Sequence, residues 1–355
     1  MAAPSQSSFR VAPADQPIPV GGSIEVSILC EPFVIFHVSE GKYYAIQNPC
    51  VACFSPSTFL NQPVDADSLT VQCAHGGHKI SLVDGTAVDG GMGQISAKVS
   101  FVEGDGLYLE LPEALADWSV WTLVERRNVA KNVDAFVFSF PEGIRNEDIL
   151  FGDGIMHISS KIMVDGASCA RDYTPTRKLP NRRIELIVKR YDDFGIMSRH
   201  YHNMVVGDTL VQRVNTRIRF NLSKLIKEKG MKKIVMVGAG TGVTPLYQVM
   251  FSEANKMLDE VQILGFFRET KEMILYPDED MPKNVTMRRF LTRRQGCADA
   301  LQEMFDREYF PRGDGTKSMY IIWCGPPGFN AILDSQLEKR DFYGFDEDCV
   351  YELPN

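Results

Sequence analysis

One short stretch constrains the fold of this 355-residue chain more than any other. Residues 235–248 read "VMVGAGTGVTPLYQ": an apolar run ends at Val237, glycines follow at 238, 240 and 242, and Thr244-Pro245 opens a helical pattern. We expect Thr244 to cap that helix and Pro245 to take its first position, where no N–H is needed. A strand that passes through a glycine-rich turn into a helix is typical of a nucleotide site, because its open backbone N–H groups bind phosphate.

The residues around this stretch predict an α/β domain over 230–355. Apolar spacing across 246–258 indicates a helix, "VQILGFF" and "SMYIIWC" are buried-strand candidates, and a further helix follows at "NAILDSQLEKR". Alternating strands and helices form a parallel sheet that binds ligands beyond the carboxyl ends of its strands. "WCGPPGF" (323–329) therefore places Cys324 at the same sheet edge as the glycine-rich turn. A buried, inert thiol is the alternative interpretation of Cys324.

The rest of the chain reads mostly as strands. Residues 20–112 hold short β runs separated by turns such as "VDGT" and "EGDG", and residues 118–225 hold a second set with one short helix at "SRHYHNM". We therefore predict three domains: all-β, antiparallel β-barrel and α/β. The formal charge of −8 argues against nucleic acid as a partner. No apolar run reaches the ~18–20 residues of a transmembrane segment, and scattered cysteines indicate reduced thiols and a cytoplasmic location.

Four motifs follow one another in a specific order: "RDYTP" (171–175), "GIMS" (195–198), "GAGTGVTP" (238–245) and "CGPP" (324–327). Together they resemble the NADH–cytochrome b5 reductase family, within the ferredoxin reductase-like flavoenzymes, over residues 118–353. The resemblance implies a six-stranded antiparallel barrel that binds FAD and an α/β domain that binds NADH or NADPH. It also implies hydride transfer to FAD, then one-electron transfer to a haem protein or other one-electron carrier such as cytochrome b5.

The resemblance assigns roles to individual residues. Thr174, near the flavin N5, and Cys324, at the nicotinamide ring, would be the catalytic residues. Contacts with FAD are implied for Arg171, Tyr173, Thr174, Gly195, Met197 and Ser198. Contacts with the nicotinamide nucleotide are implied for Lys189, Gly238, Gly240, Thr241, Thr244, Gly325 and Pro326. Members of the family often end on an aromatic residue that covers the flavin; this chain ends "CVYELPN", so Tyr351 and Leu353 are both candidates.

The nucleotide preference depends on the segment "FLTRRQG" (290–296). NADH-using members of the family carry an acidic residue after the corresponding strand, whereas Arg293 and Arg294 occupy this region here, with Arg294 as the best match to the acid. An arginine fork binds a phosphate dianion better than it binds a hydroxyl. We therefore predict that NADPH is used at least comparably to NADH. The alternative is that both arginines point into solvent.

Residues 73–80, "CAHGGHKI", raise the question of a metal site. With "PCVAC" (49–53) they resemble the two hairpins of a Rieske ferredoxin, whose cluster needs C-x-H and C-x-x-H. The histidine positions aligned on Cys50 and Cys73 hold Ala52 and Gly76, so the ligand set is incomplete. Haem is disfavoured because no histidine follows His78 until His157. We predict a Rieske-like β domain over 20–112 that has lost its cluster and kept a docking role.

An ordinary β domain unrelated to Rieske proteins is one alternative for residues 20–112, and three more stay open. A zinc site or altered cluster would draw on ligands of suitable spacing: Cys50, Cys53, Cys73, His75 and His78. A reductase component of an oxygenase, with the N-terminal domain as carrier, would need a working cluster. A flavin-free interaction protein on a decayed reductase scaffold is the third, and the intact motif residues argue against it.

Overall fold

The computed structural model describes residues 8–52, 58–145, 147, 154–193, 195–277, 280–293, 296–313 and 315–353, with the backbone alone at 114 and 216–219. The chain divides into two compact units. The first comprises Met1–Val120 with Lys161–Ala170, and the second comprises Trp121–Ser160 with Arg171–Asn355. No helix within the described ranges is long and apolar enough to cross a membrane.

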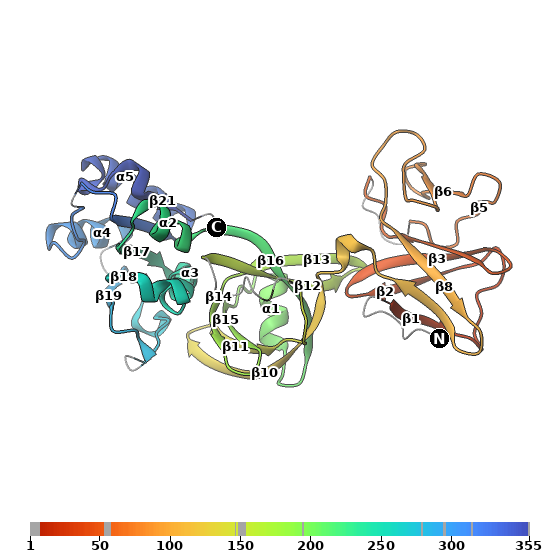
Figure 1. Ribbon diagram of the computed structural model, residues 1–355, viewed down its shortest axis with the longest axis horizontal. Coiled ribbons are helices and arrows are strands. Elements are labelled where there is room, and N and C mark those ends of the chain that lie inside the picture. The colour runs from red at the N-terminus through yellow and green to blue at the C-terminus, as the bar shows by residue number, and fades with distance from the viewer. Residues whose placement is uncertain are drawn as a thin grey trace. The chain divides into compact units, whose positions relative to one another are not determined.

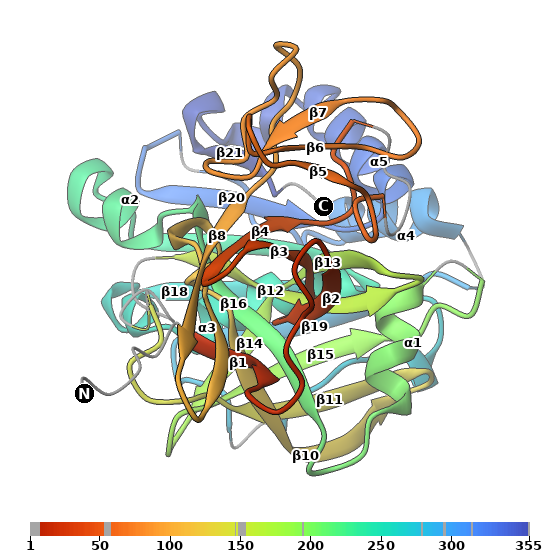
Figure 2. The same cartoon turned by 90° about the vertical axis from the view of Figure 1, so that its right-hand side faces the viewer.

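The first unit is built from antiparallel strands (Figures 1 and 2). Its larger sheet has the order β1-β9-β8-β4-β3-β2, with β1 (Ser8–Pro13), β2 (Ser23–Ile28), β3 (Glu31–Ser39), β4 (Lys42–Gln47), β8 (Ser96–Val102) and β9 (Gly106–Glu110). A smaller sheet joins β5 (Val64–Asp65), β6 (Thr70–Gln72) and β7 (Lys79–Ser81). One apolar cluster spans both sheets, because Phe36 and Ile46 pack with Val71 and Ile80. A 3-10 turn, η1 (Glu113–Leu115), follows the last strand.

Most of the next sheet belongs to the second unit, with only Ser119, Val120, Lys161–Val164 and Ala167–Ala170 in the first; its seven strands have the order β13-β12-β16-β10-β11-β15-β14. These strands are β10 (Ser119–Ala130), β11 (Val133–Ser139), β12 (Ile155–Val164), β13 (Ala167–Tyr173), β14 (Pro175–Leu179), β15 (Arg183–Lys189) and β16 (Thr209–Phe220). β13 and β14 are one chain segment interrupted only at Thr174, yet they lie at opposite edges of the sheet. The segment therefore joins the two edges, as in a barrel. The six strands expected appear as seven because the interruption at Thr174 divides this edge segment into β13 and β14.

Aromatic packing fixes the short helix α1 (Ile196–Asn203) against this sheet (Figure 1). Tyr201 is fully buried, with its ring centroid 5.2 Å from that of Phe136 and 5.9 Å from that of Phe138. Its hydroxyl is within hydrogen-bond distance of Ser160 Oγ (2.6 Å) and Gln212 Nε2 (2.9 Å). The helix predicted at "SRHYHNM" is thus anchored in the barrel core.

The remainder of the second unit is an α/β lobe on a parallel sheet of order β19-β18-β17-β20-β21 (Figure 1). Its strands are β17 (Lys233–Ala239), β18 (Glu260–Phe267), β19 (Val285–Leu291), β20 (Met319–Cys324) and β21 (Val350–Glu352). Its helices are α2 (Leu222–Lys229), α3 (Thr244–Met250), α4 (Gly296–Asp306) and α5 (Pro327–Glu338). Ile234 and Met236 join one apolar cluster, while Val235 and Val237 join another. Because alternate side chains of a strand point to opposite faces, both faces of the sheet are covered.

Two expectations about the helix after the glycine-rich turn are wrong. The helix ends at Met250 rather than continuing towards residue 258, because Ser252 is extended and its hydroxyl accepts the N–H of Asn255. A separate 3-10 turn, η4 (Glu253–Met257), starts there. Thr244 is not the cap: a 3-10 turn, η3 (Gly240–Val243), precedes the helix, and the Thr244 hydroxyl donates to the carbonyl of Thr241 over 3.0 Å.

A buried carboxylate fastens the barrel to the α/β lobe. Glu185 on β15 is fully buried and pairs with Arg127, and its carboxylate accepts hydrogen bonds from the Thr176 hydroxyl (2.9 Å) and from the hydroxyl of Tyr276 in the lobe. Nearby, the buried Gln248 side chain on α3 accepts the backbone N–H of Met156 on β12 over 2.9 Å. Buried hydrogen bonds of this kind link the barrel strands β12 and β15 to the α/β lobe.

Candidate active site

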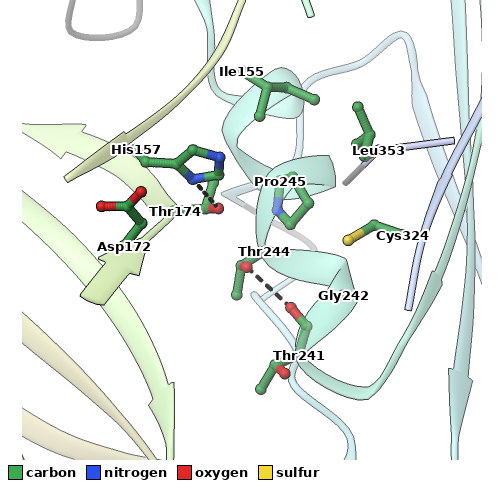
Figure 3. A pocket seen from close by; sticks show the side chains of 10 residues that line it. All are labelled: Ile155, His157, Asp172, Thr174, Thr241, Gly242, Thr244, Pro245, Cys324 and Leu353. Carbon is green, nitrogen blue, oxygen red and sulfur yellow. Dashed lines mark hydrogen bonds between the residues drawn. The ribbon is translucent and has the colours of Figure 1, made fainter. Parts of the chain in front are cut away.

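A cavity of about 210 Å³ lies where the broken edge strand of the barrel faces the glycine-rich turn (Figure 3). The barrel contributes polar side chains to one wall, and the α/β lobe contributes the turn, the start of α3 and the end of β20. The lining residues are Ile155, His157, Asp172, Thr174, Thr241, Gly242, Thr244, Pro245, Cys324 and Leu353. Predicted residues from three of the four motifs, Thr174, Thr241, Thr244 and Cys324, thus meet in one cavity.

Thr174 occupies the interruption between β13 and β14, and its side chain is held by a histidine. Thr174 Oγ1 and His157 Nδ1 are 3.0 Å apart (Figure 3). His157 lies on the neighbouring strand β12, so the sheet itself brings the two side chains together. The threonine hydroxyl therefore has a set orientation at the cavity wall.

Asp172 brings a carboxylate to the same wall. Its Oδ1 accepts the Ser159 hydroxyl over 2.6 Å and its Oδ2 accepts the Asn215 side-chain amide over 3.2 Å. Ser159 lies on β12, which is next to β13 in the sheet, and Asn215 lies on β16, the strand beyond β12. The carboxylate is thus fixed by neutral hydrogen-bond donors.

Cys324 faces the cavity from the last position of β20. Burial, with the carboxylate of Glu352 nearby, raises the pKa of the Cys324 thiol to about 11. The thiol is therefore neutral at physiological pH, whereas nucleophilic cysteines react as thiolates. The chemistry open to Cys324 is to pack against and position a bound group. A neutral thiol is expected whether Cys324 positions a ligand or is only buried and inert. The position of Cys324 in the cavity wall, and not its pKa, therefore distinguishes the two interpretations.

Each of the three glycines of the turn is favoured for a different physical reason. A Cβ at position 242 would lie 2.2 Å from the carbonyl oxygen of Cys324, so the turn packs against the end of β20 without room for a side chain. Gly240 has φ +56°, and among the described residues no heavy atom lies within 4 Å of where its Cβ would be. Its left-handed conformation favours glycine, and its open side is a cradle for a ligand. Gly238, in contrast, is required for packing, because a Cβ there would lie 2.7 Å from the side chain of Leu246.

A second, smaller hollow of about 20 Å³ lies on the other side of the same turn. Gly240 and Thr241 line it from the turn, and its charged lining residues are three cations and one carboxylate: Lys131, Lys189, Arg268 and Glu272. Lys131 comes from the β10–β11 turn, whose backbone N–H at Lys131 donates to the carbonyl of Lys271 over 2.7 Å. Thr241 lines both hollows. Uncharged groups form most of the first hollow, and positive charge dominates the second.

Tyr173 and Arg171 flank the cavity on β13. The Tyr173 ring stands edge-on to Tyr201, with centroids 4.9 Å apart, so its orientation is fixed by the barrel core. Arg171 is exposed.

The "GIMS" segment forms the start of α1, as the sequence predicted, with Gly195 as N-cap and Met197 and Ser198 buried. The Ser198 hydroxyl accepts the backbone N–H of Tyr191 over 3.1 Å and donates to the carbonyl of Gly195 over 3.0 Å. A side chain at 195 would collide with Ser198 Oγ at 2.1 Å. The side chain of Ser198 therefore shapes the loop. At the other sheet, Gly325 is required because a Cβ there would lie 2.7 Å from Phe329, and Pro326 is the N-cap of α5.

The candidate residues for nucleotide preference lie beyond β19. Arg293 forms an ion pair with Glu269, and Arg294 lies outside the residues that the structure describes. Of the two C-terminal candidates, Leu353 lines the cavity, whereas Tyr351 packs edge-on against Phe220 with centroids 5.4 Å apart. Of the two, Leu353 is therefore the one that the cavity wall includes.

The N-terminal metal candidates are spread over different environments. Cys50 and Cys73 are buried in the apolar cluster of the first unit, His75 is exposed, and His78 Nδ1 lies 3.7 Å from Asp89. Cys53 lies outside the described residues. Within the described part of the chain, no group of three or more His, Cys, Asp or Glu side chains is arranged to hold a metal ion.

Several site residues were missed by the motifs. His157, Asp172, Lys131 and Arg268 line the two hollows without having been predicted. Asp172 stood inside the "RDYTP" motif, and its charge was a usable signal. His157 and Lys131 reach the site only through the pairing of strands and the docking of the hairpin turn, which residue spacing does not reveal.

Comparisons with known proteins agree with this architecture. The oxidoreductase FAD-binding domain family matches residues 120–215. Over 279 residues the chain is 25% identical to NADH-cytochrome b5 reductase 2 of Yarrowia lipolytica, covering 72% of this chain and 89% of that protein. Over 248 residues it is 29% identical to NADH-cytochrome b5 reductase 1 of Dictyostelium discoideum, covering 66% of this chain and 81% of that protein.

A solved structure shows a similar fold over nearly the whole chain. The CS-b5R domains of human Ncb5or, in the NAD+ form, superpose with a TM-score of 0.52 at 15% identity, covering 95% of this chain and 93% of that one. The resemblance to the NADH–cytochrome b5 reductase family is confirmed for the flavin and nucleotide domains. A Rieske-like N-terminal domain is not shown by these comparisons.

Proposed function

We propose that this chain, which carries an oxidoreductase FAD-binding domain at residues 120–215 and is related to NADH-cytochrome b5 reductases, is an FAD-dependent NAD(P)H reductase. It takes electrons from a nicotinamide nucleotide and passes them to a one-electron acceptor such as cytochrome b5. The observation that carries the proposal is the pair of hollows on either side of the turn at Gly240–Gly242.

The linings of the two hollows suit two parts of a nicotinamide nucleotide, its nicotinamide ring and its pyrophosphate. The larger is lined mainly by apolar and hydroxyl groups and has a volume of about 210 Å³, which accommodates planar rings rather than a whole ligand of the usual ~300–1,000 Å³. The smaller is lined by Lys131, Lys189 and Arg268, which complement phosphate charge. A nucleotide that crosses the turn at Gly240 would put its ring against Cys324 and its phosphates among the three cations.

The residues present also fit FAD. Tyr173 offers a fixed aromatic face, Thr174 an oriented hydroxyl, and Arg171 an exposed cation beside them. Bound FAD supplies the chemistry by accepting a hydride as an electron pair and releasing electrons singly. The chain's own part is to hold both rings in register, since small misplacements raise a hydride-transfer barrier steeply. Thr174 does so from the barrel side, and Cys324 and Thr244 do so from the lobe side. Gly195, Met197 and Ser198 would hold the pyrophosphate through backbone groups at the start of α1.

The acceptor is proposed to be a haem or other one-electron carrier protein, because the relatives named above are cytochrome b5 reductases. The alternative, a reductase that feeds an oxygenase through the first unit, requires a redox centre there. Domain boundaries at 20–112, 118–225 and 230–355 and a cytoplasmic location are part of the proposal. Among the described residues, seven cysteines form no disulfide: Cys30, Cys50, Cys73, Cys169, Cys297, Cys324 and Cys349.

For the first unit we propose a Rieske-like β domain without a cluster, which serves in docking. Its support is a small three-stranded sheet packed on a larger one, with Cys50 and Cys73 enclosed by apolar side chains. Dithionite-reduced protein should then show no Rieske-type electron paramagnetic resonance signal and no stoichiometric iron. Stoichiometric iron with such a signal would instead favour the oxygenase-reductase alternative.

The acceptor is tested with purified, FAD-loaded protein and ferric cytochrome b5 under excess NADH. We expect cytochrome b5 to be reduced at a rate proportional to the concentration of this protein. If ferricyanide is reduced but cytochrome b5 is not, the reductase activity stands and cytochrome b5 is not the acceptor.

A further inference from the structure

We infer that Glu269 sets the preference between NADH and NADPH by holding Arg293 in an internal ion pair. The inference rests on the proposed function and adds a residue that no motif singled out. It concerns the edge of the parallel sheet where β18 and β19 end, next to the basic hollow.

Backbone pairing brings the two residues together. β18 and β19 are parallel neighbours with Phe267 opposite Leu291, and the pairing continues past the last strand residues. The N–H of Thr292 donates to the carbonyl of Phe267 over 2.8 Å, and the N–H of Arg293 donates to the carbonyl of Arg268 over 3.1 Å. Glu269 and Arg293 therefore sit at fixed places, and their side chains form an ion pair across the strand ends.

Glu269 is the less exposed partner. Its side chain is 16% exposed, whereas that of Arg293 is 60% exposed, and Lys271 Nζ lies 2.9 Å from the same carboxylate. Lys271, Arg293 and Lys131 all hold the pKa of Glu269 below its ordinary value, with the Lys271 hydrogen bond the largest cause. The carboxylate is therefore charged at neutral pH, and it forms ion pairs with Lys271 and Arg293 at the same time.

This arrangement gives the site two opposed determinants. In dinucleotide-binding sheets, a carboxylate beyond the strand end accepts the ribose hydroxyls of NAD, and an arginine there accommodates the 2′-phosphate of NADP. Here the carboxylate occupies the arginine fork, so a 2′-phosphate must displace Glu269 and is repelled by it. Arg268, Lys131 and Lys189 lie close by and attract phosphate without distinguishing the two nucleotides, since both carry a pyrophosphate.

An ion pair with one exposed partner can also be a surface feature of little consequence. The two interpretations differ in what happens when the carboxylate is removed. If Glu269 restrains Arg293, its loss frees the fork for a phosphate; if the pair is incidental, the nucleotide preference does not move.

The experiment compares wild type, Glu269→Gln, Arg293→Ala and the double variant, all FAD-loaded. Anaerobic flavin reduction by NADH and NADPH gives the ratio of kcat/KM for the two nucleotides. Calorimetry with adenosine 2′,5′-bisphosphate and with 5′-AMP, which differ only by the 2′-phosphate, reads binding without catalysis. Glu260→Gln is the matched control, because it makes the same charge change at the start of β18, where Glu260 pairs with Lys233 at 3.1 Å.

We expect Glu269→Gln to raise the NADPH-to-NADH ratio by about tenfold or more and to tighten binding of the 2′,5′-bisphosphate similarly, as one freed charged hydrogen bond would. Arg293→Ala should abolish that rise in the double variant, and Glu260→Gln should leave the ratio unchanged. A ratio and a bisphosphate affinity within about threefold of wild type in Glu269→Gln, with NADH still reducing the flavin, would overturn the inference alone. Failure of both nucleotides to reduce the wild-type flavin would overturn the proposed function.

Discussion

Thr174 Oγ1 lies 3.0 Å from His157 Nδ1, so the residue that interrupts the barrel's edge strand is tied to the strand beside it. The pairing explains why a hydroxyl at this break can have a defined direction towards the cavity. Pro175 begins β14 directly after the break, and the histidine holds the Thr174 side chain.

Thr174→Val keeps the shape of the side chain and removes the hydroxyl. We expect anaerobic flavin reduction by NADH to slow by about tenfold or more, because a misoriented ring raises the barrier to hydride transfer. FAD content should not change. Thr174→Ser retains the hydroxyl and should restore most of the rate; equal rates in Thr174→Val and wild type would remove Thr174 from the mechanism.

Arg171→Ala should weaken FAD retention. A charged hydrogen bond to phosphate contributes ~1.5–3 kcal/mol, so the dissociation constant of FAD should rise about 10- to 150-fold. Because Arg171 is exposed, we expect the variant to fold normally, and an unchanged thermal midpoint of the apoprotein checks this. Wild-type affinity for FAD in the variant would show that the phosphates lie elsewhere.

Cys324→Ala removes the neutral thiol from the cavity wall. We expect flavin reduction to slow while FAD content and the KM for NADH stay close to wild type, since the thiol positions a ring rather than supplying affinity. Cys324→Ser, of similar size, should lie between the two. Stopped-flow traces identical to wild type for both variants would support the alternative of a buried thiol without function.

The free energy of unfolding should fall as the pH drops below neutrality. Burial lowers the pKa of both His200 and His202 from the ordinary 6.5, so the unfolded chain binds more protons than the folded one near that pH. The contribution of the two neutral histidines to the free energy of unfolding is complete above pH 6.5, the ordinary histidine pKa that they regain in the unfolded chain. It is lost as the pH falls through their lower pKa values in the folded protein. Denaturant titrations at about pH 7.5 and about pH 5.5 measure the loss. A His200→Gln, His202→Gln variant should lose less stability over this range, and an equal loss would assign the effect to other groups.

Residue spacing was informative where neighbours in sequence are neighbours in space. The apolar runs that became β17 and β20 predicted that Cys324 and the glycine-rich turn share a sheet edge, and their parallel register pairs Gly238 with Cys324. Periodicity overextended α3 because it does not detect the hydroxyl of Ser252, which caps the new turn at Glu253–Met257 by accepting the N–H of Asn255.

Residue spacing could not predict which side chains reach the site from other strands and turns. His157 meets Thr174 because β12 and β13 are adjacent strands, and Lys131 reaches the basic hollow because a hairpin turn docks on the segment at Lys271. The ion pair of Arg293 with Glu269 likewise depends on the parallel pairing of β18 with β19. Residue spacing identified Arg293 as a candidate but did not predict its ion pair with the Glu269 carboxylate.

Anaerobic mixing of the FAD-loaded protein with NADH asks whether the cavity brings the two rings together for hydride transfer. We predict that the flavin absorption near about 450 nm, a property of flavins in general, bleaches in one kinetic phase whose rate saturates with nucleotide concentration. Oxidation of NADH in equal amount should accompany the bleaching. Purified protein that retains no FAD when it is supplied, or bound FAD that stays oxidised at saturating NADH and NADPH, would contradict the assignment as a reductase.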